Sequence, residues 1–220
     1  MRAVGFKEFG DPEVLEVMDI PEVYASQGEI RIKNYASAVN PTDIVSRSGL
    51  IAQFRKDYPL PAVPGMDISG IVDQVGEGVE TGVSIGDQVM GMVIPNALHG
   101  AYSEQITLNQ FAVVKAPKGF SFVESATLPM NGLTARLSLD LLNLTKGQVV
   151  AVTGGPGAYG GYVIQLAKAD GLIVIADSNE SDIELLRELG VDHIIPRGEN
   201  FAKKIKAVSY THLRAHETPI

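Results

Sequence analysis

The chain has 220 residues, of which 45% are hydrophobic, with a formal net charge of −8 and no cysteine. Its length and apolar content are sufficient for one or two domains with buried cores. The acidic charge and the lack of a basic stripe argue against nucleic acid and anionic membrane surfaces as partners, and the lack of cysteine excludes disulfides, thiolate metal sites and cysteine nucleophiles.

Neither a targeting segment nor a membrane span is apparent in the sequence. The N-terminus has no apolar run of the length that a signal peptide requires, and no segment approaches the ~20 apolar residues of a spanning helix. We therefore expect a soluble, cytoplasmic protein.

Short strand-like runs recur over the first half of the chain, each bounded by turn residues such as glycine, proline, asparagine and aspartate. This spacing predicts a small antiparallel barrel or sandwich, which we assign to residues 1–122. The predicted strands are Ala3–Phe6, Val14–Met18, Glu29–Val39, Asp67–Val75, Gln88–Val93, Ala101–Thr107 and Ala112–Lys115.

Two helical patterns follow and mark the start of a second domain, which we assign to residues 123–207. Ser121 and Glu124 have the spacing of a capping box, in which each side chain bonds the backbone N–H of the other residue. Asn131–Leu142 repeats leucine at a helical spacing, which predicts a second helix.

Beyond these helices the chain alternates between strand and helix signals. The β-branched run Gln148–Thr153 predicts a strand, and the stretch after it shows apolar residues at a helical period until Gly171. Leu172–Ala176 predicts a second strand, which is followed at once by Asp177. The alternation continues with a helix at Ile183–Leu189 and a strand at Val191–Ile195. This order predicts a doubly wound parallel sheet of the α/β class.

Three glycines with G-x-G-x-x-G spacing join the first of these strands to its helix. In dinucleotide-binding folds Gly155 would permit the tight turn, Gly157 would let the backbone approach a pyrophosphate, and Gly160 would let the helix pack closely on the sheet. The N–H groups at the helix start, at Ala158 and Tyr159, would then bind phosphate oxygens. The alternative is a glycine turn that only connects a strand to a helix.

The pattern ends near residue 207. A dinucleotide-binding fold has about six parallel strands, and the sequence supplies only about half of them. Residues 208–220 show no matching period, and we interpret His212 and His216, four residues apart, as part of a foreign tail rather than a helical metal pair. We therefore expect an incomplete second domain, and we expect these 220 residues alone to be inactive or poorly folded because a sheet edge would stay uncovered.

Several motifs in order carry a family resemblance. They are Val39-Asn40-Pro41-Thr42-Asp43, Arg47-Ser48-Gly49, Pro64-Gly65-Met66-Asp67-Ile68-Ser69-Gly70, Gly86-Asp87-Gln88-Val89, Gly100-Ala101-Tyr102 and Ala126-Thr127-Leu128-Pro129. With the glycine turn, they make the chain resemble the medium-chain dehydrogenase/reductase superfamily over residues 1–207, in particular its zinc-independent quinone oxidoreductase branch. The resemblance implies a GroES-like antiparallel barrel domain followed by a Rossmann domain, with the active site between the two.

The zinc-dependent members of this family have cysteine and histidine where this chain has Asn40 and Met66, and glutamate where it has Asp67. Neutral asparagine and methionine cannot replace thiolate and imidazole as zinc ligands, so we expect no metal. The resemblance then implies hydride transfer from NAD(P)H to a quinone or an α,β-unsaturated carbonyl. The alternatives are an enoyl-thioester reductase of the same fold and, from another class, a nucleotide-binding or structural protein without turnover. The family also implies a homodimeric full-length parent.

The resemblance implies that Asn40, Asp43 and Tyr58 are candidate catalytic residues and that Thr134 contacts the cofactor. For Asn40 and Asp43 the alternative is a turn whose side chains bond their own backbone. Thr134 matches a cofactor-contacting threonine of the family, or it is an ordinary helix hydroxyl. Tyr58 replaces the tyrosine that many quinone reductases carry after Arg-Ser-Gly, or it is a plain core or surface tyrosine.

The choice of cofactor depends on the residues after the second predicted strand. Related zinc-independent enzymes commonly use NADPH, whose 2′-phosphate favours a nearby arginine or lysine. This chain has Asp177 and Ser178 there, and its next cation is Arg187. Asp177 favours the 2′-hydroxyl of NADH, whereas Ser178 and Asn179 would bind a phosphate if Asp177 turned aside. NADPH is slightly favoured on family grounds, and both cofactors stay open.

Overall fold

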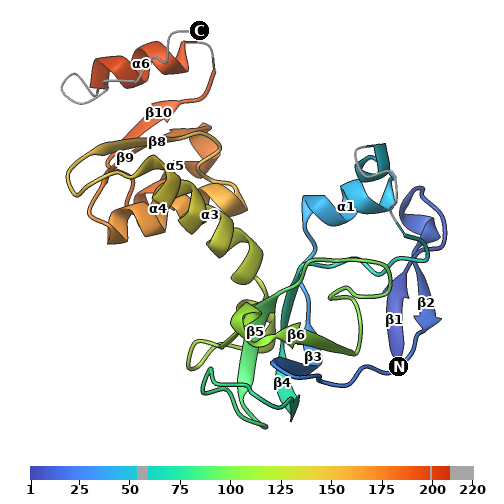
Figure 1. Ribbon diagram of the computed structural model, residues 1–220. Helices are drawn as coiled ribbons and strands as arrows, with labels where there is room; N and C mark the ends of the chain where they lie inside the picture. Colours follow the sequence, from blue (N-terminus) through green and yellow to red (C-terminus); the bar gives the residue numbers. More distant parts are fainter. Residues whose placement is uncertain (54–58, 199, 209–220) are drawn as a thin grey trace, which may run out of the picture. The chain divides into compact units, whose positions relative to one another are not determined.

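The computed structural model describes residues 1–53, 59–198 and 200–208. The chain divides into two compact units, Met1–Met130 and Asn131–Ile220, which are described separately (Figure 1). In chain order, the first unit contains β1 (Arg2–Gly5), η1 (Pro12–Val14), β2 (Glu16–Asp19), β3 (Glu29–Ala36), α1 (Pro41–Arg47), η2 (Ile51–Gln53), β4 (Asp67–Val75), β5 (Gln88–Met92), β6 (Gln105–Asn109), η3 (Gln110–Ala112), β7 (Val113–Lys115) and α2 (Phe122–Ala126).

The first unit is built on a five-stranded antiparallel sheet with the order β6-β3-β4-β5-β7. The expected antiparallel architecture is confirmed, but within the described residues the sheet is open and its edges are β6 and β7. The hairpin of β1 and β2 forms a separate ladder, since Ala3 meets Ser103, and Phe6 meets Ala62, through isolated bridges only. The N-terminal strands therefore do not extend the five-stranded sheet into a closed barrel.

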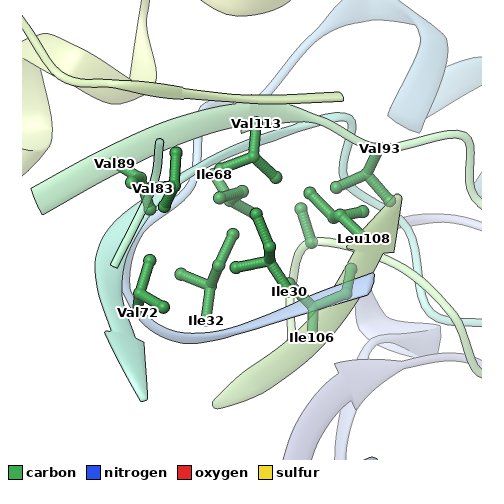
Figure 2. Packing of buried hydrophobic residues seen from close by; sticks show 11 residues of the cluster. Ile30, Ile32, Ile68, Val72, Val83, Val89, Val93, Ile106, Leu108 and Val113 are labelled. Carbon is green, nitrogen blue, oxygen red and sulfur yellow. The ribbon is translucent and has the colours of Figure 1, made fainter. Parts of the chain in front are cut away.

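The core of this unit follows the two-residue period of its strands, which places alternate side chains on one face. Ile30 and Ile32 of β3 are fully buried, as is Ile68 of β4. Figure 2 shows how these side chains point toward one another from neighbouring strands. The cluster consists of Ile30, Ile32, Ile68, Val72, Val83, Val89, Val93, Ala101, Ile106, Leu108 and Val113.

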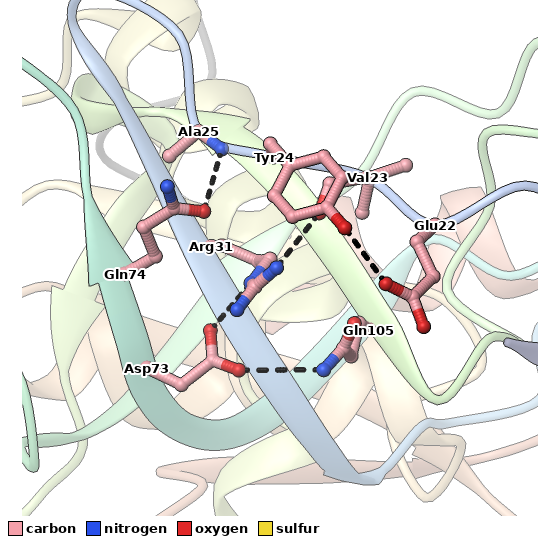
Figure 3. A network of polar contacts seen from close by, with 8 residues as sticks. All are labelled: Glu22, Val23, Tyr24, Ala25, Arg31, Asp73, Gln74 and Gln105. Atoms are coloured by element: carbon pink, nitrogen blue, oxygen red, sulfur yellow. Dashed lines mark hydrogen bonds and ion pairs between the residues drawn. The ribbon is translucent and has the colours of Figure 1, made fainter.

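A polar network fixes the segment of residues 21–27 against the other side of β3 and β4 (Figure 3). Arg31 pairs with Asp73, with 2.8 Å between Nε and Oδ1, and both side chains are largely shielded from solvent. The same guanidinium donates to the Val23 carbonyl at 3.0 Å and lies 5.4 Å from the ring centre of Tyr24. One arginine thus connects two strands and the segment that covers them.

The second unit contains a parallel sheet with the order β10-β9-β8. Its described elements, from the helix that spans the boundary onward, are α3 (Pro129–Leu142), β8 (Val149–Val152), α4 (Ala158–Ala169), β9 (Ile173–Ser178), η4 (Glu180–Asp182), α5 (Ile183–Glu188), β10 (His193–Pro196) and α6 (Phe201–Val208). The predicted alternation of strand and helix is confirmed, with β10 placed slightly later than expected. Fully buried Ile164, Val174 and Leu186 lie in the core, where α4 and α5 pack on the sheet.

One face of α3 is left exposed in the described part of the chain. Ala135 and Leu139 enter the core, whereas the leucines that predicted this helix, Leu133, Leu137 and Leu141, are more than half exposed.

In the described residues, no helix combines the length and apolar character needed to cross a bilayer.

Candidate functional site

The glycine turn between β8 and α4 has the geometry that each glycine requires. A Cβ at position 160 would lie 2.4 Å from the Gly154 carbonyl oxygen, so only glycine allows α4 to approach the turn this closely. A Cβ at position 155 would lie 2.9 Å from Ala176 Cβ on β9. A Cβ at position 157 would lie 3.2 Å from the Gly154 oxygen, which is closer than an ordinary van der Waals contact. Gly157 is exposed and carries no side chain, so its backbone is accessible to a pyrophosphate.

The start of α4 is suited to an anion. Gly157 is the N-cap with extended backbone (φ −71°, ψ 162°), and the helix begins at Ala158. Its first turn holds no acidic side chain, so no carboxylate of that turn compensates the positive end of the helix dipole. The glycine turn and these N–H groups fit a dinucleotide pyrophosphate.

Two predicted cofactor residues are connected by a residue that sequence reasoning missed. The Tyr159 hydroxyl donates to Ser138 Oγ at 2.7 Å, and Ser138 Oγ donates to the Thr134 carbonyl at 2.8 Å. Ser138 thus joins the first turn of α4 to α3 beside Thr134. Its position one helical turn after Thr134 is the signal that would have identified it.

Asp177 lies at the end of β9 and is bonded to the glycine turn. Its Oδ1 accepts from the Gly154 N–H at 2.6 Å, and its Oδ2 accepts from Arg197 Nε at 2.8 Å. Desolvation opposes its ionisation, but the hydrogen bonds from Arg197 and from the Gly154 and Gly155 N–H groups outweigh it and lower the pKa of Asp177. Ser178 is 3% exposed and donates its hydroxyl to the Asn179 carbonyl at 2.6 Å.

Arg197 was not among the predicted site residues. It follows β10, and the parallel pairing of β10 with β9 places Pro196 opposite Ser178. The cation that sequence analysis did consider, Arg187, lies on α5 and pairs with Glu184 at 3.2 Å. A search for cations after each strand, rather than after β9 alone, would have found Arg197, because the carboxyl ends of neighbouring parallel strands lie at one edge.

In the first unit, Asp43 fixes the start of α1. Its Oδ2 accepts from the Asn40 backbone N–H at 2.8 Å and from the Tyr102 hydroxyl at 3.2 Å, while its Oδ1 accepts from the Gly65 N–H at 2.9 Å. Asp43 is 6% exposed and Asn40 is 4% exposed. Asp43 therefore makes the bonds to backbone N–H groups that were expected if it only stabilises a turn. Its catalytic role stays a prediction.

The side chain of Asn40 is bound by Asp67, the first residue of β4. Asn40 Nδ2 donates to Asp67 Oδ2 at 2.6 Å, and Asp67 Oδ1 accepts from the Met130 N–H at 2.6 Å. Asp67 is fully buried, and desolvation, the largest effect on it, raises its pKa despite these hydrogen bonds. Nearby, Thr42 Oγ1 donates to the Met66 thioether at 3.1 Å. Both residues at the family's zinc-ligand positions are therefore engaged with protein groups.

Three residues considered from the sequence, Tyr58, His212 and His216, lie outside the described residues. Within the described ones, no group of three or more histidine, cysteine, aspartate or glutamate side chains is placed to hold a metal ion.

Comparison with known proteins gives the class of the chain. Residues 26–133 match the alcohol dehydrogenase GroES-like domain. The chain is 35% identical over 213 residues to 2-methylene-furan-3-one reductase of Solanum lycopersicum, covering 91% of this chain and 53% of that protein. It is 32% identical over 203 residues to the chloroplastic NADPH-dependent alkenal/one oxidoreductase of Arabidopsis thaliana, covering 87% and 51%. The chain thus spans about half the length of these curated relatives.

Solved structures agree with these relatives. The chain superposes on a quinone oxidoreductase from Coxiella burnetii with a TM-score of 0.80 at 33% identity, over 93% of this chain and 65% of that one. The superposition on an NAD-dependent alcohol dehydrogenase has a TM-score of 0.84 at 31% identity, and it covers 96% of this chain and 68% of that one. The superposition on the CurK enoyl reductase has a TM-score of 0.85 at 26% identity, and it covers 95% of this chain and 64% of that one.

The chain therefore belongs to the medium-chain dehydrogenase/reductase superfamily, as its motifs predicted. Its place within the superfamily is the quinone oxidoreductase-like branch.

Proposed function

We propose that this chain carries the cofactor site of a zinc-independent reductase that transfers hydride from NAD(P)H to a quinone or an α,β-unsaturated carbonyl. The observation that carries the proposal is the exposed backbone of Gly157, which no side chain covers, beside the start of α4 and the Asp177–Gly154 bond. The names of two relatives, an alkenal/one oxidoreductase and a quinone oxidoreductase, support this substrate class.

In this proposal the residues of the second unit bind and orient the cofactor. The N–H groups of Ala158 and Tyr159 bind the pyrophosphate, and Asp177 orients the adenosine ribose. When bound, the reduced nicotinamide supplies the hydride, and the protein supplies position and electrostatics. Thr134 is the proposed contact on the nicotinamide side.

The chemistry of the donors in the first unit favours a reaction without zinc. Asn40 offers an amide and Met66 a thioether where a zinc site needs thiolate and imidazole. Reduction of a conjugated carbonyl suits such a site, because negative charge delocalises over the acceptor without a Lewis acid. Asn40 and Asp43 remain the proposed residues on the substrate side. A cytoplasmic location, a small-molecule partner and a homodimer complete the proposal.

The test is oxidation of NADPH and of NADH with 1,4-benzoquinone and, separately, with crotonyl-CoA. It uses the longest reading frame that contains this sequence, with the 220-residue chain in parallel. We expect turnover with the quinone by the longer protein and none by the shorter chain. Faster turnover with crotonyl-CoA would favour an enoyl-thioester reductase, to which the similarity to CurK points. Cofactor binding without any turnover would favour a nucleotide-binding protein that is not an enzyme.

A further inference from the structure

Arg197 is held in place at the edge of the proposed adenosine site. Its backbone N–H donates to the Ser178 carbonyl at 2.9 Å, which extends the pairing of β10 with β9 by one residue. Its side chain then reaches Asp177, with 2.8 Å between Nε and Oδ2. The backbone bond and the ion pair together fix a guanidinium beside the residue that was expected to bind ribose.

The pair is asymmetric in its access to solvent. The Asp177 side chain is 10% exposed, whereas the Arg197 side chain is 43% exposed. A guanidinium carries five N–H donors, and the bond to Asp177 uses only Nε. Arg197 can therefore bond a second anion while it keeps its contact with the carboxylate.

The charge of this pair bears directly on the choice of cofactor. An unpaired Asp177 carboxylate would repel the 2′-phosphate of NADPH, and the ion pair with Arg197 compensates that charge. Ser178, one of the residues expected to bind the phosphate, is buried and donates its hydroxyl to Asn179. Arginine is also the side chain best suited to phosphate, because its planar fork of donors matches the phosphate oxygens.

We propose that Arg197, oriented by Asp177, binds the 2′-phosphate and makes the site select NADPH over NADH. This inference rests on the proposed function, because it requires a nucleotide at the glycine turn. It assigns Asp177 a second role: the carboxylate positions the arginine as well as the ribose.

The experiment measures by calorimetry the binding of 2′,5′-ADP and of 5′-AMP, which differ only in the 2′-phosphate, to the longest reading frame that contains this sequence. These probes need only the adenosine part of the site, all of whose proposed residues lie in the second unit. The wild-type chain should bind 2′,5′-ADP at least about tenfold more tightly, as expected for a charge-assisted hydrogen bond. Arg197→Gln should abolish this preference and change 5′-AMP affinity by less than about threefold. Arg197→Lys, which keeps the charge, should retain part of the preference.

The matched control is Arg187→Gln. It removes the exposed arginine that forms an ion pair with Glu184 on α5, and it should leave the affinities for both probes unchanged. An Arg197→Gln chain that keeps the wild-type ratio of affinities would overturn the inference and leave the proposed function standing. Equal weakening of both probes would also overturn it, since the arginine would then act on the fold of the site. A wild-type chain that binds neither probe would overturn the proposed function and this inference with it.

Discussion

Asn40 donates its side-chain amide to a fully buried carboxylate, with 2.6 Å between Asn40 Nδ2 and Asp67 Oδ2. The same carboxylate accepts from the N–H of Met130, at the start of α3. Asp67 thus connects α1, β4 and α3 through one side chain. The residue at a zinc-ligand position of the family is therefore bound here to a carboxylate of the protein.

Replacement of Asp67 by alanine should destabilise the first unit. The substitution deprives Asn40 Nδ2 and the Met130 N–H of a buried acceptor, and an unsatisfied buried donor costs about 1–3 kcal/mol. Urea unfolding followed by circular dichroism measures the change. Asp11→Ala is the control, because Asp11 is exposed and its side chain caps no helix. Equal stability of the two variants would show that the Asp67 contacts add nothing.

Asp67 and Asp177 should affect stability in opposite directions as the pH changes. Burial raises the pKa of Asp67 above its usual 3.8, so its contribution to stability falls as the pH rises from 3.8 through the raised pKa. The pKa of Asp177 is lowered because its hydrogen bonds outweigh desolvation, so its contribution is present above 3.8 and is lost as the pH falls through the lowered pKa.

Unfolding free energies of wild type, Asp67→Ala and Asp177→Asn across the acid range measure both effects. The difference between wild type and Asp67→Ala should shrink above pH 3.8, and the difference between wild type and Asp177→Asn should shrink below it. If both differences in unfolding free energy changed in the same direction with pH, the opposite pKa shifts of Asp67 and Asp177 would be contradicted.

The adjacent glycines of α4 should respond oppositely to alanine. At position 160 the new Cβ would meet the Gly154 oxygen at 2.4 Å, and such overpacking costs about 1–3 kcal/mol. At position 161 the nearest atom would be Leu189 Cδ1 at 3.7 Å, an ordinary contact, so Gly161→Ala should be neutral or stabilise by about 0.4–1 kcal/mol. Thermal melting of both variants checks this, and a stable Gly160→Ala protein would refute the close approach.

The local parts of this structure were predictable from the sequence, and the contacts between distant segments were not. The β-branched run, the glycines and the helical period that predict β8 and α4 lie within adjacent residues. The Asp177–Arg197 bond depends on which strand pairs beside β9 and in what register, and neither follows from the residues around Asp177.

The same reason explains one contact of the first unit that was not predicted and one expected feature, the closed barrel, that the described residues do not show. Asn40 and Asp67 were both identified as zinc-position residues, yet their mutual bond needs α1 and β4 to meet across 27 positions. The strand pattern predicted antiparallel pairing, whereas a closed barrel depends on where β1 pairs. In the structure β1 pairs with β2 instead of joining the larger sheet.

The central claim, that the glycine turn is a nucleotide site, is tested most directly by titrating NADPH into the longest reading frame that contains this sequence and into its Gly157→Val variant. Valine can adopt the extended backbone of position 157, but its Cβ would lie 3.2 Å from the Gly154 oxygen, so thermal melting first checks that the variant still folds. In the folded variant the valine side chain should block the pyrophosphate. We predict saturable binding by the wild type and at least about tenfold weaker binding by the variant. No binding by the wild type, or equal affinity in the two proteins, would contradict the claim.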